Sequence, residues 1–473
     1  MKRTHWPLWI IGALAATVAG LRLVQVPMTH DESSTVLNYS FLPVVDILTN
    51  QPPSANNHIL NTLLVKGMIA LGGMEKVLIR LPNFLALALY LGFGYSLVRP
   101  LAHRRSGHWL GLGLLLFNPY LLEFFALARG YGLGIGFMVA AAAMGFWFLE
   151  HRRLGYLAGS AAFALLAVYS NLTQLNFFVA WIGGLNLYMW AHWKAFGLRH
   201  WLRANALLLL AAALLAGLLY LPVQALLDSG ELYYGGKTGF FADTIRSLID
   251  NTLYGQVYFG RDFPLILSWV TVAAVVGGMA ISVARTVRGA GAGPAFYLTG
   301  ILALMVLSTV VQFHVLGTRF LIGRTALLFL PVAALLVLNL MRYAPPWGQG
   351  VLFSLLLLHL YQAVNFDQAR DWWYDRKTEQ VFWYLQEQHA DPRDTIGLGA
   401  DWIFGPTLNF YNRRYGKGNI IMSWHKSDPM DDGWDYYYTD QKPAEALEGY
   451  QLEHKFSSYR LYKRNRNLKE DNQ

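Results

Sequence analysis

The sequence has no cysteine, and only 14% of its 473 residues are Asp, Glu, Lys or Arg. The first absence excludes disulfide bonds and thiolate metal sites. The second argues against an ordinary soluble globular protein, in which about 25% of the residues are charged. Hydrophobic residues make up 55% of the chain, and apolar runs long enough to cross a bilayer recur along it. These runs predict a polytopic α-helical membrane protein.

Eleven apolar segments predict transmembrane helices. The first segment has a basic start and no small-residue cleavage site, so we interpret it as a retained span and not as a removed signal peptide. The expected spans cover residues 7–27, 77–98, 107–124, 131–149, 154–170, 174–191, 204–222, 263–284, 294–314, 325–341 and 347–365.

The basic residues predict which side of the membrane each loop faces. Loops that lie inside when the N-terminus is cytoplasmic hold 13 Lys and Arg residues, whereas the longer outside connections hold 8. Cytoplasmic loops retain positive charge during insertion, so this bias predicts a cytoplasmic N-terminus. An odd number of spans then places the C-terminal region outside. Of the 11 Asp and Glu residues before residue 366, only Glu150 falls on the inner side, which predicts polar chemistry on the outer face.

The composition divides the chain into two parts. Residues 1–365 hold 23 Lys and Arg against 11 Asp and Glu, whereas residues 366–473 hold 15 against 18. The basic excess belongs to the membrane part, where it reports orientation, and we expect no binding of nucleic acid. Residues 28–76 and 223–262 are expected to form two outer loops, the first with an interfacial helix and the second as an ordered cap. Residues 366–473 predict a small soluble α/β domain.

The segment "VPMTHDESSTVL" places an Asp-Glu pair just after the first expected span. Asp31 and Glu32 follow His30 and precede a run of Ser and Thr residues. The structural alternatives are solvated acids in a loop, or an Asp31 that caps a short helix. A carboxylate at the membrane surface can also act as a general base on an acceptor hydroxyl or amine. Asp31 is therefore the first catalytic candidate, and His30 beside it is a candidate for substrate binding.

Cationic side chains near the same outer boundary are candidates for binding a phosphate group. Arginine holds phosphate through fork-like, charge-assisted hydrogen bonds. Transfer from a lipid-linked phosphosugar requires such cations at headgroup depth, close to a base. The candidates for the donor phosphate are Arg129, Arg319, Arg324, Lys66 and His58. Surface hydrogen bonding explains an interfacial histidine equally well, and snorkelling explains an interfacial lysine.

The order of these segments resembles the GT-C superfamily of membrane glycosyltransferases. After the Asp-Glu pair come the interfacial "NNHILNTLL", then "LIRLPNFLALALYL", "NPYLLEFFALARGYGL" and a late "GRTALLFLPVAALL". The chain is most similar to the bacterial branch related to protein O-mannosyltransferases and to the aminoarabinose transferases that modify lipid A. The similarity covers the first 150 residues best.

The resemblance implies a function and a location. It implies a polyprenyl-phosphate sugar donor, an acceptor that is a glycan, a lipid or a protein, and an inverting transfer on the outer face of the bacterial inner membrane. The family's loop aspartate falls on Asp31 and would act as the base, and Glu32 would help to position the substrates.

Two further family elements have counterparts in this sequence. The Glu-Ala-Arg-x-Tyr element falls on residues 127–131, where Arg129 and Tyr131 are kept and Leu127 replaces the glutamate. Glu123, one helical turn earlier, is the acidic residue nearest to that position. The family's His-Pro-Pro element appears as Asn57-His58-Ile59, without the prolines. Asn57 and Tyr131 are therefore further candidates for substrate binding.

Other function classes have less support. No cofactor is predicted. A divalent metal stays an open alternative without support, since the spacing of the His, Asp and Glu residues between His30 and His58 matches no familiar metal site. The rivals are a transporter or flippase that binds lipid-linked sugars without chemistry, and a non-catalytic receptor or assembly subunit. Transporters tend to show internal repeats and ionisable residues at mid-membrane. This sequence shows no repeat and gathers its charges at the outer face, which favours an enzyme.

Overall fold

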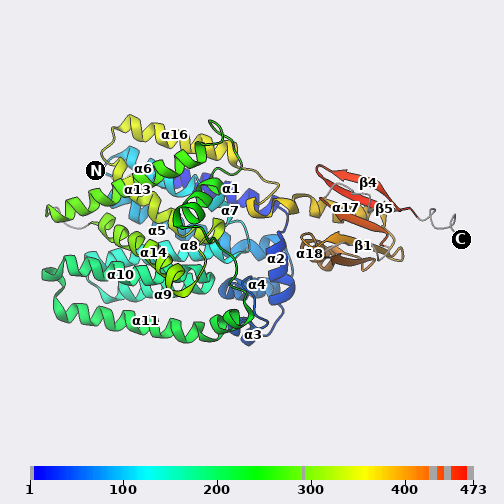
Figure 1. The fold of residues 1–473 in the computed structure, drawn as a ribbon, viewed down its shortest axis with the longest axis horizontal. Helices are drawn as coiled ribbons and strands as arrows, with labels where there is room; N and C mark the ends of the chain where they lie inside the picture. Colours follow the sequence, from blue (N-terminus) through cyan, green and yellow to red (C-terminus); the bar gives the residue numbers. More distant parts are fainter. Residues whose placement is uncertain (1–4, 290–292, 426–433, 441–448, 466–473) are drawn as a thin grey trace.

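The protein has two parts, which Figure 1 shows side by side. The computed structural model describes residues 5–289, 293–425, 434–440 and 449–465. A bundle of long helices takes up most of the chain, and a small sheet with its own helices lies beyond one end of the bundle. This confirms the predicted fold class, a helical membrane protein with a small C-terminal α/β domain.

The bundle forms where apolar residues run on without interruption. Within the described ranges, six helices are long and apolar enough to cross a membrane, namely α1 (Trp6–Gln25), α5 (Lys76–Leu101), α8 (Gly130–His151), α11 (Trp193–Ser229), α13 (Phe263–Val287) and α14 (Pro294–Leu316). Shorter helices stand beside them, namely α6 (Arg105–Leu116), α9 (Leu154–Ser170), α10 (Leu175–Ala191), α15 (Phe329–Met341) and α16 (Pro346–Ala363). Each of the expected spans overlaps one of these helices, and their number in the membrane stays a prediction.

The expected span 107–124 is wrong at its outer end. Helix α6 ends at Leu116, and α7 (Pro119–Glu123) is a separate short helix. The Asn118 side chain accepts a hydrogen bond from the Leu121 backbone N–H at 3.0 Å, and proline occupies the first helical position. Proline has no N–H to donate to a preceding turn, so the helix stops and starts again here.

Short helices cover the end of the bundle that lies nearer the sheet domain (Figure 1). They are α2 (His30–Ser34), η1 (Thr35–Tyr39), α3 (Val44–Thr49), α4 (Ile59–Gly72), η2 (Leu172–Gln174), η3 (Phe240–Arg246), α12 (Ser247–Thr252) and η4 (Gly323–Ala326). Helix α4 has 14 residues, too few for a span, and it lies where the sequence predicts an interfacial helix. The second outer loop begins later than expected, because α11 continues to Ser229 and ends at Gly230 with φ of 70°.

The C-terminal part is built around a mixed five-stranded sheet. The strands lie in the order β2-β1-β3-β5-β4, with β1 parallel to β2 and β3, and with β5 antiparallel to β3 and β4. The elements are η5 (Arg370–Lys377), α17 (Thr378–Gln388), β1 (Ile396–Asp401), α18 (Gly405–Tyr415), β2 (Ile420–His425), β3 (Tyr436–Thr439), β4 (Tyr450–Phe456) and β5 (Tyr459–Arg464). These helices and strands form the small α/β domain that the sequence predicts for this part of the chain.

A continuous apolar core joins the two parts. Met28, Val36 and Ile79 from the bundle side share one buried cluster with Phe382 and Leu408 of the sheet domain. Polar contacts add to this core. The Met28 backbone N–H donates to the Tyr411 hydroxyl at 2.9 Å, and the His30 backbone N–H donates to Asp375 at 2.6 Å. The sheet domain is therefore packed against the segment that carries Asp31.

We expect truncation of this shared core to loosen the whole protein. Phe382 is only 2% exposed, so Phe382→Ala removes a buried ring and should cost about 3–5 kcal/mol of unfolding free energy. The neighbouring Trp383 is 40% exposed, and Trp383→Ala should cost about 1 kcal/mol or less. Denaturant unfolding of both purified variants tests this. Equal losses for the two variants would contradict the packing described here.

Candidate active site

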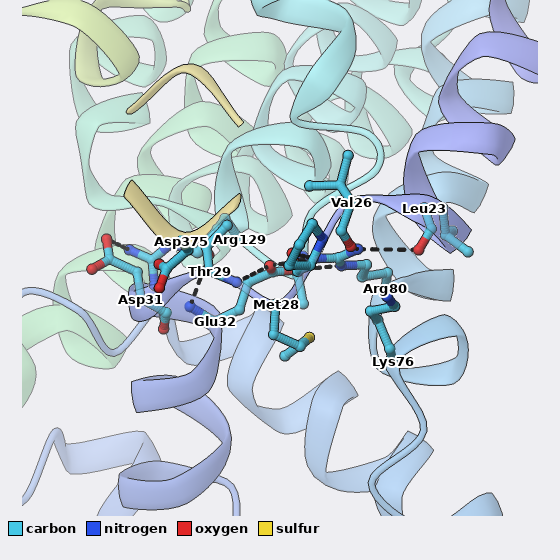
Figure 2. A network of polar contacts seen from close by, with 12 residues as sticks. Leu23, Val26, Met28, Thr29, Asp31, Glu32, Lys76, Arg80, Arg129 and Asp375 are labelled. Atoms are coloured by element: carbon cyan, nitrogen blue, oxygen red, sulfur yellow. Dashed lines mark hydrogen bonds and ion pairs between the residues drawn. The ribbon is translucent and has the colours of Figure 1, made fainter. Parts of the chain in front are cut away.

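Asp31 and Glu32 point in different directions because of how helix α2 starts. The Thr29 hydroxyl accepts the Glu32 N–H at 3.3 Å, and the Glu32 carboxylate accepts the Thr29 N–H at 3.0 Å. This reciprocal pair is a capping box, for which the sequence Thr-His-Asp-Glu is suited. Thr29, and not Asp31, is thus the capping residue. Figure 2 shows Glu32 directed toward Arg80 and Asp31 directed toward Arg129.

Glu32 is fully buried in an ion pair. Arg80 donates from Nε to Oε1 at 2.8 Å and from Nη2 to Oε2 at 2.7 Å (Figure 2). The Ala128 backbone N–H donates to Oε1 at 2.6 Å. Burial alone would raise the pKa of Glu32, but the Arg80 guanidinium outweighs it and holds the pKa below the ordinary value. Both oxygens of Glu32 are engaged in these hydrogen bonds. The carboxylate therefore holds Arg80 and the Ala128 backbone in place.

Asp31 lies between two arginines. Its Oδ2 is 3.3 Å from Arg129 Nη2 and 3.6 Å from Arg324 Nη2, and the side chain is 17% exposed. The indole N–H of Trp372 also donates to it. Burial would raise the pKa of Asp31, but Arg129 and Arg324 together hold it below the ordinary value. Asp31 is therefore an ionised carboxylate with a face open to solvent.

Arg129 is held by the first outer loop. It precedes α8, and its Nη1 donates to the Thr35 hydroxyl at 3.2 Å. Its Nη2 donates to His58 Nε2 at 3.1 Å. Burial and the charge of Arg129 keep the pKa of His58 well below the ordinary value, so His58 is neutral and can accept this bond. Gly130 allows the close approach, because a Cβ there would overlap the Ser170 carbonyl oxygen.

Arg324 is held by the segment that follows the last helix of the bundle. Its Nη1 donates to Asp371 at 3.1 Å. Its guanidinium lies 4.9 Å from the ring centre of Trp372 and 5.1 Å from that of Tyr234. The Tyr120 hydroxyl donates to both oxygens of Asp371, at 3.1 and 3.2 Å. These aromatic rings shield the cation from water, and so strengthen its interaction with any anion.

Sequence reasoning missed Asp371, Trp372, Tyr120 and Tyr234 as parts of this site. For Asp371 and Trp372, the available signal was the acidic and aromatic run "DWWYD", which lies a few residues after the last apolar segment. Its anchor is another buried network. Glu123 accepts from Arg22 at 2.9 Å, from the Tyr254 hydroxyl at 2.5 Å and from the Arg370 backbone N–H at 3.1 Å, which fixes the residue before Asp371.

The structure brings together only some of the predicted site residues. Asp31, Arg129, Arg324 and His58 are in contact, and the Tyr131 ring lies 5.1 Å from the His58 ring. The other candidates have partners elsewhere or lie apart. Lys66 donates to the carbonyls of Ser40 and Leu42, and His30 Nδ1 lies 2.9 Å from the Ile403 carbonyl. The Asn57 side chain donates hydrogen bonds to the Ile47 carbonyl and to Asn50. Arg319 lies beside Gly235.

Within the described ranges, no cluster of three or more His, Asp or Glu side chains is arranged to hold a metal ion. The site instead offers two cations around one carboxylate. Such a set suits a ligand that carries a phosphate and reacts by losing or gaining a proton.

The Glu32–Arg80 pair should be a large contributor to stability. Glu32→Gln leaves the Arg80 charge buried and uncompensated, so we expect a loss of about 3–5 kcal/mol in unfolding free energy. The control is Glu379→Gln, since Glu379 pairs with Lys76 at 3.2 Å while 27% exposed. Breaking that pair should cost about 1 kcal/mol or less. Denaturation in detergent measures both, and a mild loss for Glu32→Gln would argue against the clamp.

No protein-family model and no curated protein matches this chain. Solved structures do. ArnT from Cupriavidus metallidurans bound to undecaprenyl phosphate is 13% identical over 90% of this chain and 87% of that chain, with a TM-score of 0.55. The apo state of the same protein is 11% identical with the same coverage, with a TM-score of 0.52. At this identity the likeness concerns the fold. This chain therefore shares the fold of ArnT, which agrees with the fold class that the order of its segments predicts.

Proposed function

We propose that the protein is a membrane glycosyltransferase that moves a sugar from a polyprenyl-phosphate donor to an acceptor hydroxyl or amine. The reaction takes place on the outer face of a bacterial inner membrane, with the N-terminus in the cytoplasm and the sheet domain outside. The observation that carries the proposal is the grouping of Asp31 with Arg129 and Arg324. The fold shared with ArnT, which has been solved with undecaprenyl phosphate bound, supports the class of donor.

Arg129 and Arg324 bind the donor phosphate in this proposal. Both point an Nη2 atom at the same oxygen of Asp31, so both reach one small region of space. Each also has a buried Nε atom that finds no hydrogen-bond partner in the described part of the chain. A buried N–H that lacks an acceptor is costly, and a phosphate oxygen is a strong acceptor for it. The arginines are thus arranged for a ligand with several anionic oxygens.

Asp31 acts as the general base. It takes the proton of the acceptor hydroxyl or amine, whose oxygen or nitrogen forms a bond to C1 of the sugar. The bond between C1 and the phosphate oxygen breaks at the same time. The polyprenyl phosphate leaves with the electron pair, and a single displacement inverts the configuration at C1. Arg129 and Arg324 face the negative charge that grows on the leaving phosphate.

Donor binding makes Asp31 a better base. In the free protein, Arg129 and Arg324 stabilise the ionised carboxylate and so weaken its affinity for a proton. A bound phosphate offsets part of their positive charge. The pKa of Asp31 then rises toward the ordinary value, and proton transfer becomes easier when donor and acceptor are both present.

The remaining candidates have supporting roles. Glu32 fixes the start of α2, and neutral His58 orients Arg129 through its Nε2 atom. Tyr131, next to His58, faces the donor. We assign His30, Asn57 and Lys66 to holding the outer segments, since their polar atoms are engaged there. Arg319 forms no ion pair with the residues that the structure describes, and it remains a candidate for the approaching donor.

Replacing the base should abolish transfer without unfolding the protein. Asp31→Asn keeps the shape of the side chain but cannot take a proton, so we expect the rate to fall at least about 100-fold. The assay incubates purified protein and candidate acceptors with radiolabelled polyprenyl-phosphate sugars and measures the free polyprenyl phosphate. Asp46→Asn, in the same outer segment, is the control and should keep wild-type activity. Near-normal turnover by folded Asp31→Asn would overturn the assignment, and movement of intact donor lipid without release would indicate a flippase.

The pH dependence of kcat/KM should show the effect of Arg129 and Arg324 on the pKa of Asp31. Because the pKa of Asp31 lies below 3.8, wild-type kcat/KM should stay level as the pH falls toward that value. Arg324→Gln removes one of the charges that lower this pKa, so its acid limb should move to higher pH. Arg319→Gln serves as the control, because Arg319 is not in contact with Asp31, and its acid limb should stay in place. An unshifted limb in Arg324→Gln would contradict the role of Asp31 as the titrating base.

A further inference from the structure

A polar pocket lies at the end of the bundle opposite Asp31. Helix α5 begins near the candidate active site and runs for 26 residues, about 39 Å, to Leu101. There a cavity of about 250 Å³ opens between the C-terminal ends of α5, α13 and α15 and the N-terminal end of α14. In Figure 1 this is the end of the bundle away from the sheet domain. Its lining includes His103, Ser282, Arg285, Pro294, Asn339 and Arg342.

The charged groups of this pocket are basic. Arg342 donates to Asn339 Oδ1 at 3.3 Å and lies 3.5 Å from His103 Nδ1, and Arg285 donates to the Tyr343 hydroxyl at 3.4 Å. Within the described ranges, no carboxylate lies within ion-pair distance of Arg285, Arg342 or His103. Burial and the charge of Arg285 lower the pKa of Arg342, and burial and both arginines lower that of His103. The charges of Arg285 and Arg342 therefore repel each other.

Two further features favour an anion in the pocket. The Nε atom of Arg342 is buried and has no hydrogen-bond partner among the residues that the structure describes. Helix α14 begins in the pocket wall, and Gly293 provides no side chain to cap its first N–H groups. The positive end of the helix dipole therefore adds to the field of the arginines.

We propose that this pocket binds a phosphate group, either the headgroup of an anionic phospholipid or a soluble phosphate compound. The cavity is smaller than the 300–1,000 Å³ typical of sites for drug-sized ligands, which suits a single phosphate. A phosphate would give Arg285 and Arg342 the counter-charge that the protein does not supply, and would give Arg342 Nε an acceptor. The binding site is separate from the proposed transfer reaction.

The surroundings place this pocket at the depth of lipid headgroups. Tyr343 is 61% exposed and Trp347 is 74% exposed beside it, and these residue types favour the membrane–water interface. In the predicted orientation the pocket faces the cytoplasmic leaflet. Basic pockets between transmembrane helices on that side are suited to the headgroups of anionic lipids.

The test uses the full-length protein in neutral detergent. The probes are phosphatidylglycerol, phosphatidylcholine and inorganic phosphate, with bound lipid measured by native mass spectrometry and stabilisation measured by thermal unfolding. We expect the wild-type protein to bind phosphatidylglycerol more tightly than phosphatidylcholine. Arg285→Gln and Arg342→Gln should each weaken this binding about tenfold. Arg288→Gln is the matched control, because Arg288 is exposed one turn away on the same chain segment and does not line the pocket.

The arms of the experiment separate the sources of the phosphate. If inorganic phosphate competes with phosphatidylglycerol in the wild-type protein, and Arg285→Gln removes this competition, then one site recognises the phosphate group itself. Binding of phosphatidylglycerol alone assigns the site to a lipid, and binding of inorganic phosphate alone assigns it to a soluble compound. If Arg342→Gln does not fold, Arg285→Gln still decides, since the hydrogen bond that Arg285 makes to a described residue is to the Tyr343 hydroxyl. The proposal would be overturned if Arg285→Gln and Arg342→Gln bound phosphatidylglycerol and inorganic phosphate as tightly as the wild-type protein does.

Discussion

The buried ion pair between Glu32 and Arg80 fixes the geometry on which the rest of the site depends. Arg80 also donates to the carbonyls of Leu23, Val26 and Pro27, where α1 ends and the chain turns into the first outer loop. Glu32 accepts the N–H of Ala128, the residue before Arg129. One pair therefore ties α1, α2, α5 and the start of α8 together. Because Asp31 adjoins Glu32 and Arg129 adjoins Ala128, the pair also sets the 3.3 Å contact between them.

The sheet domain and its linker complete the other half of the site. Asp371 and Trp372 belong to the segment that leads into this domain, and both contact Arg324. The linker is held at the bundle by Glu123 and Arg22, and the domain itself holds α2 through the bond from the His30 N–H to Asp375. Asp31 is thus supported from the helical bundle by Arg80 and from the side of the sheet domain by Asp375. The sheet domain is therefore a structural part of the site and not only a neighbour of it.

Much of this arrangement could be predicted from the sequence, because the membrane restricts what a chain can do. Apolar runs predict helices, and the positive-inside bias predicts their direction. Charges at the outer ends of spans are costly, which is why Arg129 and Arg324 could be singled out beside Asp31. The break at Asn118-Pro119 was also readable, since this dipeptide favours a new helix start. The capping box from Thr29 to Glu32 could have separated the roles of the two carboxylates.

What could not be predicted are the contacts between distant segments. Asp371 meets Arg324 from 47 residues away and Tyr120 from 251 residues away. A local pattern does not contain such pairings, because they depend on how the helices pack. The same limit explains Lys66 and Asn57, which look like ligands in the sequence but are engaged by nearby backbone and side-chain groups.

The charges of the site suggest why a carboxylate and two arginines belong together in the proposed reaction. In the free protein, Asp31 and Asp371 balance Arg129 and Arg324, so the buried group is close to neutral. When Asp31 takes the acceptor's proton, it loses its negative charge. The leaving phosphate gains a negative charge in the same step, within reach of the same arginines. The transfer therefore moves charge from one partner of the arginines to another, which limits the electrostatic cost of the reaction in a site of low polarity.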